Sequence, residues 1–131
     1  ALSGVKMSIA TPKGFEPNKS TVKVSQNLTD IELTTDPLKA AKNADVVVTD
    51  THSSIHNNDS KRIKKFIPKY QVNDKIMDLA KKNAIFLHCL PAKRDQEVTS
   101  SVIDGSQSVV WDEAENRLHT QKALLCALLH A

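Results

Sequence analysis

The amino-acid sequence predicts an α/β fold in which an open parallel sheet carries helices on both faces. Short apolar segments alternate with segments of helical character along all 131 residues, and this alternation is typical of a parallel sheet. Two of the apolar segments, 46–48 (Val-Val-Val) and 85–87 (Ile-Phe-Leu), are continuous rather than alternating. Continuous runs favour parallel strands that are buried on both faces.

The individual elements follow from these runs and from the residues that begin or end helices. Asp36 and Pro37 form a typical helix start, because aspartate can cap the first turn and proline fits the first helical position. Pro68 ends another helix, and leucines form an apolar stripe on the last one. Strands are expected at 5–10, 31–34, 45–49, 84–88 and 108–111, and helices at 20–26, 37–43, 59–66, 73–82, 98–103 and from 112 or 113 onward.

Polar side chains gather just after three of the expected strands. Ligands of open parallel sheets bind beyond the carboxyl ends of the strands, so these positions predict one polar cleft. The cleft would hold an acid, a thiol, hydroxyls and a guanidinium. Its candidate residues are Asp50, His52, Ser53, Ser54 and His56 after the third strand, His88, Cys89, Leu90 and Pro91 after the fourth, and Glu113, Glu115, Asn116 and Arg117 after the fifth.

The histidines and the thiol of this cleft could in principle hold zinc. His52 and His56 are one helical turn apart, but they fall in an expected loop, so we expect no metal. A Cys-His nucleophile is also disfavoured, because neighbours such as His88 and Cys89 point to opposite faces of a strand. A buried, inert thiol is the alternative for Cys89.

Arg117 has two interpretations at this stage. It follows Glu113 and Glu115, so an ion pair on a solvated helix is one. The other is an anion contact at the strand end, to which the guanidinium fork is suited. Composition does not choose between them.

Composition excludes several classes of function. The net charge is +3 and aromatic residues make up 4% of the chain, so single-stranded nucleic acid would find no stacking platforms. The basic residues at 61, 62, 64 and 65 are interpreted as a solvated helix face, with a phosphate or nucleic-acid patch as the alternative. Cys89 and Cys126 form no CxxC pair, which favours a reducing compartment. No apolar run has the length of a membrane span, and no GxGxxG or P-loop motif is present.

Several motifs together resemble the ornithine carbamoyltransferases, and they extend over essentially the whole chain. The segment 86–91 (Phe-Leu-His-Cys-Leu-Pro) resembles the family's HCLP signature, and Glu97 and Val98 match an EV pair that follows it. The segment 114–119 is similar to the closing AENR helix, 10–17 is similar to ATPKGYEP, and 45–51 and 70–73 match in the same order. Aspartate carbamoyltransferases are less similar, because they carry HPLP where this chain has Cys89.

The resemblance implies an enzyme that transfers the carbamoyl group of carbamoyl phosphate to the side-chain amine of ornithine. The products are citrulline and phosphate, in a step of arginine biosynthesis or the urea cycle. Fixed donors and cations would stabilise the negative charge of the intermediate and of the leaving phosphate, with no metal or organic cofactor. A Rossmann-like three-layer fold, a homotrimer and a cytoplasmic location are expected, with the mitochondrial matrix as the alternative location.

The resemblance also assigns residues around carbamoyl phosphate. Cys89 is expected to be catalytic, because a thiol or thiolate beside the reacting amine could assist its deprotonation. The backbone carbonyls of Cys89 and Leu90 would contact the carbamoyl amide, and Arg117 would contact carbamoyl phosphate. The peptide bond before Pro91 is typically cis in the family.

Ornithine would be bound by Asp50, Ser54 and Ile55, and here the chain departs from the family pattern. Asp50 and Ser54 of the D-x-x-x-S-M-G loop are retained, but methionine is replaced by Ile55 and glycine by His56. Histidine lacks the conformational freedom of glycine at positive φ, and the family's aromatic residue is absent at His52. Substrate choice or loop closure could therefore differ, so another amine acceptor remains an alternative.

Residues 1–131 are expected to form the C-terminal, ornithine-binding domain, without the carbamoyl-phosphate-binding domain and without the first, central strand of its own sheet. In the family's 3-2-1-4-5 order, that strand lies between the strands at 5–10 and 45–49. The chain alone should therefore be inactive, and it should fold poorly or leave strand edges and the last helix uncovered. A non-catalytic amino-acid-binding or regulatory relative is the competing hypothesis.

Overall fold

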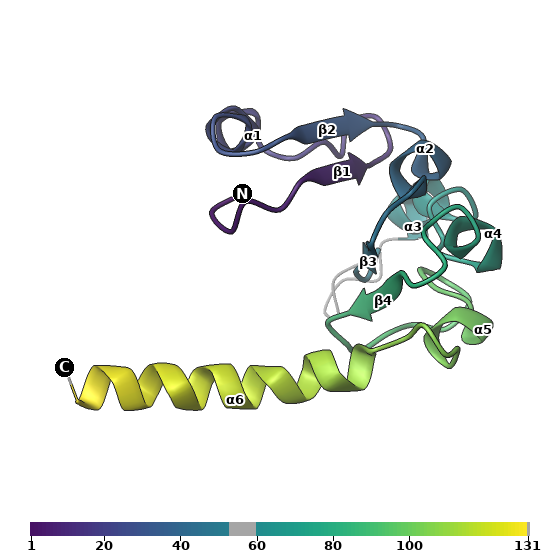
Figure 1. Cartoon of the computed structure of the whole chain (residues 1–131). Coiled ribbons are helices and arrows are strands. Elements are labelled where there is room, and N and C mark those ends of the chain that lie inside the picture. Colours follow the sequence, from purple (N-terminus) through teal and green to yellow (C-terminus); the bar gives the residue numbers. More distant parts are fainter. Residues whose placement is uncertain (53–59, 131) are drawn as a thin grey trace.

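A computed structural model describes residues 1–52 and 60–130 of the chain (Figure 1). Within these ranges the chain forms short strands and helices in alternation, followed by one long helix. The elements are β1 (Met7–Ala10), α1 (Lys19–Gln26), β2 (Ile31–Thr34), α2 (Pro37–Ala41), β3 (Val46–Thr49), α3 (Ser60–Phe66), α4 (Asp74–Met77), β4 (Ile85–His88), α5 (Ser100–Ile103) and α6 (Val110–Leu129). The parallel α/β class predicted from the sequence is confirmed.

The first parallel pair consists of β1 and β2, in which Met7 aligns with Ile31. The helix α1 connects them and begins at Asn18, whose side chain accepts hydrogen bonds from the amides of Ser20 and Thr21. The amides of a first helical turn have no partner within the helix, and a capping side chain usually accepts their hydrogen bonds. At the start of α2, the Asp36 carboxylate likewise accepts from the Leu38 amide at 3.0 Å, as predicted.

The second parallel pair consists of β3 and β4, and it lies beside the buried core. Val47 aligns with Phe86 in this pair. Both side chains are buried, together with residues of α4, α5 and the start of α6. The core therefore lies between the β3–β4 pair and the C-terminal half of the chain. Its members are Ala41, Val47, Val72, Ile76, Met77, Phe86, Val98, Val102, Ile103 and Val110.

The two strand pairs are separate sheets, and a cavity of about 1250 Å³ is lined by residues of both β1 and β3. The exposed strand edges expected from the sequence are thus present. The expectation that β3 is buried on both faces is wrong, because Val46 and Val48 are 42% and 63% exposed. Both line the cavity, where the described chain places no element against them.

The expected strand at 108–111 is also wrong. Only a single bridge joins Ser108 to Phe86, and the Val109 amide donates to the Phe86 carbonyl at 3.0 Å. The helix α6 then begins at Val110, which is fully buried and anchors its first turn. From Val110 onward the chain is therefore helical where a strand was expected.

The helix expected at 73–82 ends early, at Met77. The Leu79 carbonyl accepts from the Asn43 amide at 2.9 Å, and the Lys81 amide donates to the Ala44 carbonyl at 3.0 Å. Because these groups form hydrogen bonds with the segment that leads into β3, they are not available for the hydrogen bonds that would extend α4. The shortening of α4 thus ties it to the start of the second strand pair.

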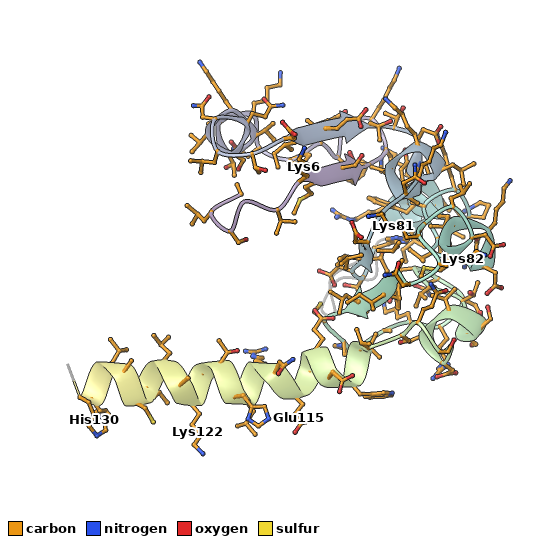
Figure 2. All side chains as sticks on the ribbon, in the orientation of Figure 1. Lys6, Lys81, Lys82, Glu115, Lys122 and His130 are labelled. Atoms are coloured by element: carbon orange, nitrogen blue, oxygen red, sulfur yellow. The ribbon has the colours of Figure 1, made fainter. Side chains whose placement is uncertain are left out.

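The long helix α6 extends away from the rest of the chain (Figure 1). Figure 2 shows Glu115, Lys122 and His130 along the side of α6 that faces away from the other elements. Its large apolar side chains beyond the first turn are exposed, with Leu118 at 65% and Leu129 at 81%. The uncovered leucine stripe expected from the sequence is confirmed. Among the described residues, no helix is both long and apolar enough to cross a membrane.

The contrast between core and cavity gives a stability prediction for the 131-residue chain. Phe86 is fully buried, so Phe86→Ala should lower the free energy of unfolding by about 3–5 kcal/mol. The matched variant Val48→Thr, at an exposed position of the neighbouring strand, should change it by less than about 0.5 kcal/mol. Denaturant unfolding followed by circular dichroism measures both, and equal effects would contradict the placement of the core.

Candidate active site

The carboxyl ends of β3 and β4 bring an acid and a thiol together. The parallel register aligns Thr49 with His88, so the next residues, Asp50 and Cys89, leave the sheet side by side. The Cys89 thiol donates a hydrogen bond to Asp50 Oδ1 at 3.3 Å. The same oxygen accepts from the Thr51 amide at 2.6 Å. The two residues are 39 positions apart in sequence, and strand pairing alone makes them neighbours.

The surroundings of Cys89 favour the protonated thiol. Partial desolvation raises the pKa of Cys89 most, and the hydrogen bond to Asp50 and the negative charges of Asp50 and Glu113 raise it further. A thiolate beside a carboxylate would suffer like-charge repulsion. In this structure Cys89 is therefore a hydrogen-bond donor to Asp50 rather than a preformed base.

The segment after Cys89 makes a sharp turn with two unusual backbone features. Leu90 has a positive φ of 52°, and the Leu90–Pro91 peptide bond is cis, as the resemblance predicted. The Leu90 amide donates to Nδ1 of His88 at 2.9 Å. This turn places the backbone of Cys89 and Leu90 next to the Asp50–Cys89 pair.

A buried histidine and glutamate lie behind the turn. His88 and Glu97 are both fully buried, and His88 Nε2 lies 3.3 Å from Glu97 Oε1. Oε1 also accepts from the Lys93 amide at 2.6 Å. His88 thus faces the interior while Cys89 contacts Asp50, which confirms that the two neighbours point apart and do not form a Cys-His pair.

His52 is the other buried polar residue of this region. Its ring stacks on Phe66 with centroids 4.7 Å apart, and its carbonyl accepts from Nε of Arg62 at 2.7 Å. Burial lowers the pKa of His52 most, and the positive charge of Arg62 lowers it too, against the opposing charges of Glu97 and Asp50. The imidazole is therefore neutral near pH 7.

A cavity of about 510 Å³ runs along β3 from Val46 to Asp50, and residues of β1 line its other side, so it continues the gap between these two strands. Asp50, Thr51 and His52 line it, together with Phe66 and Tyr70 from the helical side. The Tyr70 hydroxyl donates to the Thr35 carbonyl at 2.8 Å, which holds its ring in place. The acid of the candidate site therefore borders a space large enough for an amino acid.

Arg117 lies on the exposed part of α6, one turn beyond Glu113. Among the described residues, Arg117 forms no ion pair with Glu113 or Glu115, and Glu115 instead lies 3.2 Å from His119 in an i,i+4 pair. Glu113 is close enough to act electrostatically on Cys89. Arg117 therefore shares a helix with a residue of the site but does not join the Asp50–Cys89 pair.

The structure does not describe some of the site residues that were predicted from the sequence. Residues 53–56 lie outside the described residues, so the expected part of Ser54 and Ile55 in ornithine binding, and the expected place of Ser53 and His56 in the cleft, stay predictions. In the part of the chain that is described, His, Cys, Asp and Glu form no group of three that could hold a metal ion.

The sequence reasoning also missed the His88–Glu97 contact. Glu97 had drawn attention only as half of a matching EV pair. The full burial of Glu97 becomes visible only in the structure, where a buried carboxylate needs hydrogen-bond partners; the sequence alone carried no signal for it.

Comparison with known proteins identifies the family of this chain. The family model for the Asp/Orn binding domain of aspartate/ornithine carbamoyltransferases matches residues 1–128. The chain belongs to the aspartate/ornithine carbamoyltransferase family. Its sequence is 58% identical to the ornithine carbamoyltransferase of Cenarchaeum symbiosum over 128 residues, which is 98% of this chain and 42% of that protein.

Solved structures of carbamoyltransferases share the fold. The anabolic ornithine carbamoyltransferase of Campylobacter jejuni aligns with a TM-score of 0.88 at 36% identity, over 98% of this chain and 44% of that one. The Pyrococcus furiosus ornithine carbamoyltransferase aligns with a TM-score of 0.84 at 45% identity, over 93% and 41%. The chain thus spans less than half the length of these carbamoyltransferases.

The Cys89 environment gives a chemical prediction. Asp50→Asn removes the negative charge that raises the pKa of the thiol, so Cys89 should be alkylated faster at pH 7.5. Iodoacetamide labelling with peptide mass spectrometry measures Cys89 and uses the exposed Cys126 as the internal reference. Asp30→Asn, which removes a carboxylate paired with Lys6 instead, is the control and should leave the rate unchanged. Slower labelling in Asp50→Asn would refute the electrostatic account.

His52 gives a pH prediction for stability. Its folded-state pKa is lowered by burial, so below about pH 6.5, the usual value, the unfolded chain binds a proton that the folded chain refuses. Stability should therefore be full above that pH and fall on acidification, by up to about 1.4 kcal/mol per pH unit. His52→Phe should flatten the decline of the unfolding midpoint between pH 7.5 and 5, whereas His119→Gln, at an exposed position, should not.

Proposed function

We propose that this chain is the amino-acid-binding part of an ornithine carbamoyltransferase. The full-length protein would transfer the carbamoyl group of carbamoyl phosphate to the side-chain amine of ornithine and release citrulline and phosphate. The observation that carries the proposal is the Asp50–Cys89 hydrogen bond of 3.3 Å at the ends of β3 and β4. It lies within a chain that is 58% identical to an ornithine carbamoyltransferase.

Asp50 and Cys89 would have different roles in this reaction. The Asp50 carboxylate borders the 510 Å³ cavity and offers a negative charge to the α-ammonium group of ornithine. The Cys89 side chain would lie against the reacting amine, which must be neutral to attack. As the new C–N bond forms and the C–O bond to phosphate breaks, the nitrogen loses a proton. The Cys89 sulfur would accept that proton while the thiol gives its own proton to Asp50 Oδ1, along the hydrogen bond that already joins them.

The remaining contacts would come from the turn and from α6. The carbonyls of Cys89 and Leu90 would accept hydrogen bonds from the carbamoyl amide, since the turn places them beside the thiol. Arg117 would contact the phosphate side of carbamoyl phosphate, with Ser54 and Ile55 adding contacts to ornithine. The chain supplies no metal in this scheme, and charge stabilisation falls to donors and cations.

The domain interpretation belongs to the same proposal. Residues 1–131 would form an ornithine-binding domain whose sheet is completed by a strand between β1 and β3. The cavity of about 1250 Å³ between these strands supports this view. A carbamoyl-phosphate-binding domain would cover α6, whose exposed leucines support such a contact. The full-length protein would be a cytoplasmic homotrimer acting in arginine biosynthesis, without a nucleic-acid partner.

A related amine is the second candidate acceptor. The ornithine loop departs from the family pattern at Ile55 and His56. In addition, an acetylornithine transcarbamylase solved with acetylcitrulline aligns with a TM-score of 0.79 at 27% identity, over 95% of this chain and 40% of that one. The scaffold is therefore compatible with more than one amine of the ornithine type.

Turnover by the full-length protein tests the proposal. We expect citrulline to form from carbamoyl phosphate and ornithine, with a kcat/KM at least about a hundredfold higher than with putrescine or acetylornithine, because neither of these amines has a free α-ammonium group. Lysine has both amines but a side chain one methylene longer, so its kcat/KM should be lower by about tenfold or more. Cys89→Ser should lower kcat by about tenfold or more. Cys126→Ser, the same conservative change at a cysteine that takes no part in the Asp50–Cys89 pair, is the matched control and should keep most of the activity.

Three other results would each change the assignment. Preference for a different amine would move the acceptor to the second candidate. Absence of turnover with every amine, in a protein that still binds an amino acid, would favour a binding or regulatory relative. Full activity of Cys89→Ser would remove the thiol from the chemistry.

A further inference from the structure

We propose that His88 and Glu97 are positioning residues that hold the Cys89–Leu90 turn in its binding conformation. The inference rests on the proposed carbamoyl transfer, because that turn would carry the contacts to the carbamoyl group. Neither side chain would touch substrate. Both act from behind the turn, on the buried side of the sheet end.

The side chains of His88 and Glu97 hold the loop that follows β4 at the Leu90 and Lys93 amides. Nδ1 of His88 accepts from the Leu90 amide at 2.9 Å, which fixes the middle of the turn. Nε2 of His88 lies 3.3 Å from Glu97 Oε1, and the same oxygen accepts from the Lys93 amide at 2.6 Å. The loop from 89 to 96 is thus held at its start and its middle by one carboxylate oxygen.

This pattern selects one tautomer of His88. Nδ1 must be unprotonated, because it accepts the Leu90 amide hydrogen. The ring proton is then on Nε2, from which it donates to Glu97. Because Glu97 keeps the ring proton on Nε2 of His88, Nδ1 stays free to accept the hydrogen of the Leu90 amide. The Glu97 carboxylate therefore acts on the turn through the imidazole.

Burial makes these bonds costly to lose. His88 and Glu97 are both fully buried, so water cannot replace a missing partner, and an unpaired buried group is destabilising. The Glu97 backbone is fixed as well, because its carbonyl accepts from the Val72 amide at 2.9 Å. The carboxylate is thus a rigid support, and the Leu90 amide is positioned against a rigid imidazole.

The geometry also separates this role from that of a catalytic base. Cys89 Sγ donates to Asp50 rather than to His88. A buried imidazole that already uses both nitrogens, one for Leu90 and one for Glu97, has no site left for a substrate proton. His88 consequently acts on the turn and not on the amine.

Two substitutions at His88 separate the two nitrogens. In His88→Asn, the amide oxygen takes the place of Nδ1 and can still accept from the Leu90 amide. In His88→Gln, the amide nitrogen takes the place of Nε2 and can still donate to Glu97, but Leu90 loses its acceptor. Because the turn depends on the first bond, His88→Asn should keep activity where His88→Gln loses it, although both lose one buried hydrogen bond.

The experiment uses the full-length protein. For His88→Gln, we expect kcat/KM for carbamoyl phosphate to fall by about tenfold or more, with His88→Asn within about threefold of the wild type. Glu97→Gln, which retains an acceptor oxygen for the Lys93 amide, should resemble His88→Asn. Glu97→Leu removes both the acceptor of the Lys93 amide and the partner that keeps the His88 proton on Nε2, so Nδ1 is no longer fixed as the acceptor for Leu90 and the variant should resemble His88→Gln. Exchange of the Leu90 amide, followed by NMR, should be slow in wild type and His88→Asn and fast in His88→Gln.

Each alternative result has a definite meaning. Equal losses in His88→Asn and His88→Gln that follow their unfolding temperatures would reduce the pair to a purely structural role and overturn the inference. Wild-type activity in His88→Gln would also overturn it. If the wild type itself has no carbamoyltransferase activity, the proposed function fails, and Leu90 amide exchange alone then decides whether the pair holds the turn.

Discussion

The parallel pairing of β3 with β4 is the constraint on which the candidate site depends. It aligns Thr49 with His88 and thereby makes Asp50 and Cys89 neighbours across 39 residues of sequence. Since strand pairing fixes backbones but not side chains, the turn after Cys89 needs its own support, which Glu97 gives through His88. The site therefore comes from one short pairing of four residues per strand, and its support comes from the loop that follows β4.

The other edge of β3 has the opposite character. It opens on the cavity of about 1250 Å³ shared with β1, and Val48 remains 63% exposed there. Parallel strands are normally buried on both faces, whereas this continuous valine run borders open space. The part of the chain that contains the candidate site is well packed. Elements such as α2 connect it to β1 and β2.

The sequence predicted most of this because its signals were local. Helix starts at Asn18 and Asp36 and the four paired strands follow from capping residues and short apolar runs. The strand expected at 108–111 failed, because a buried Val110 can begin a helix as well as end a strand. The Asp50–Cys89 contact was predictable from strand ends, but the His88–Glu97 bond depends on where the loop between them folds back, and no local pattern encodes that path.

The separation of α6 from the body has a mechanical consequence. With 20 residues, the helix is about 30 Å long, and its anchor is the buried Val110 at one end. A rotation of about 10° at this anchor would move the far end by about 5 Å, by the geometry of a rigid rod of that length. The same rotation would move Glu113, about one turn from the anchor, by only about 1 Å, so a contact on the distal leucines would swing the far end of α6 while the charge that acts on Cys89 stays nearly in place.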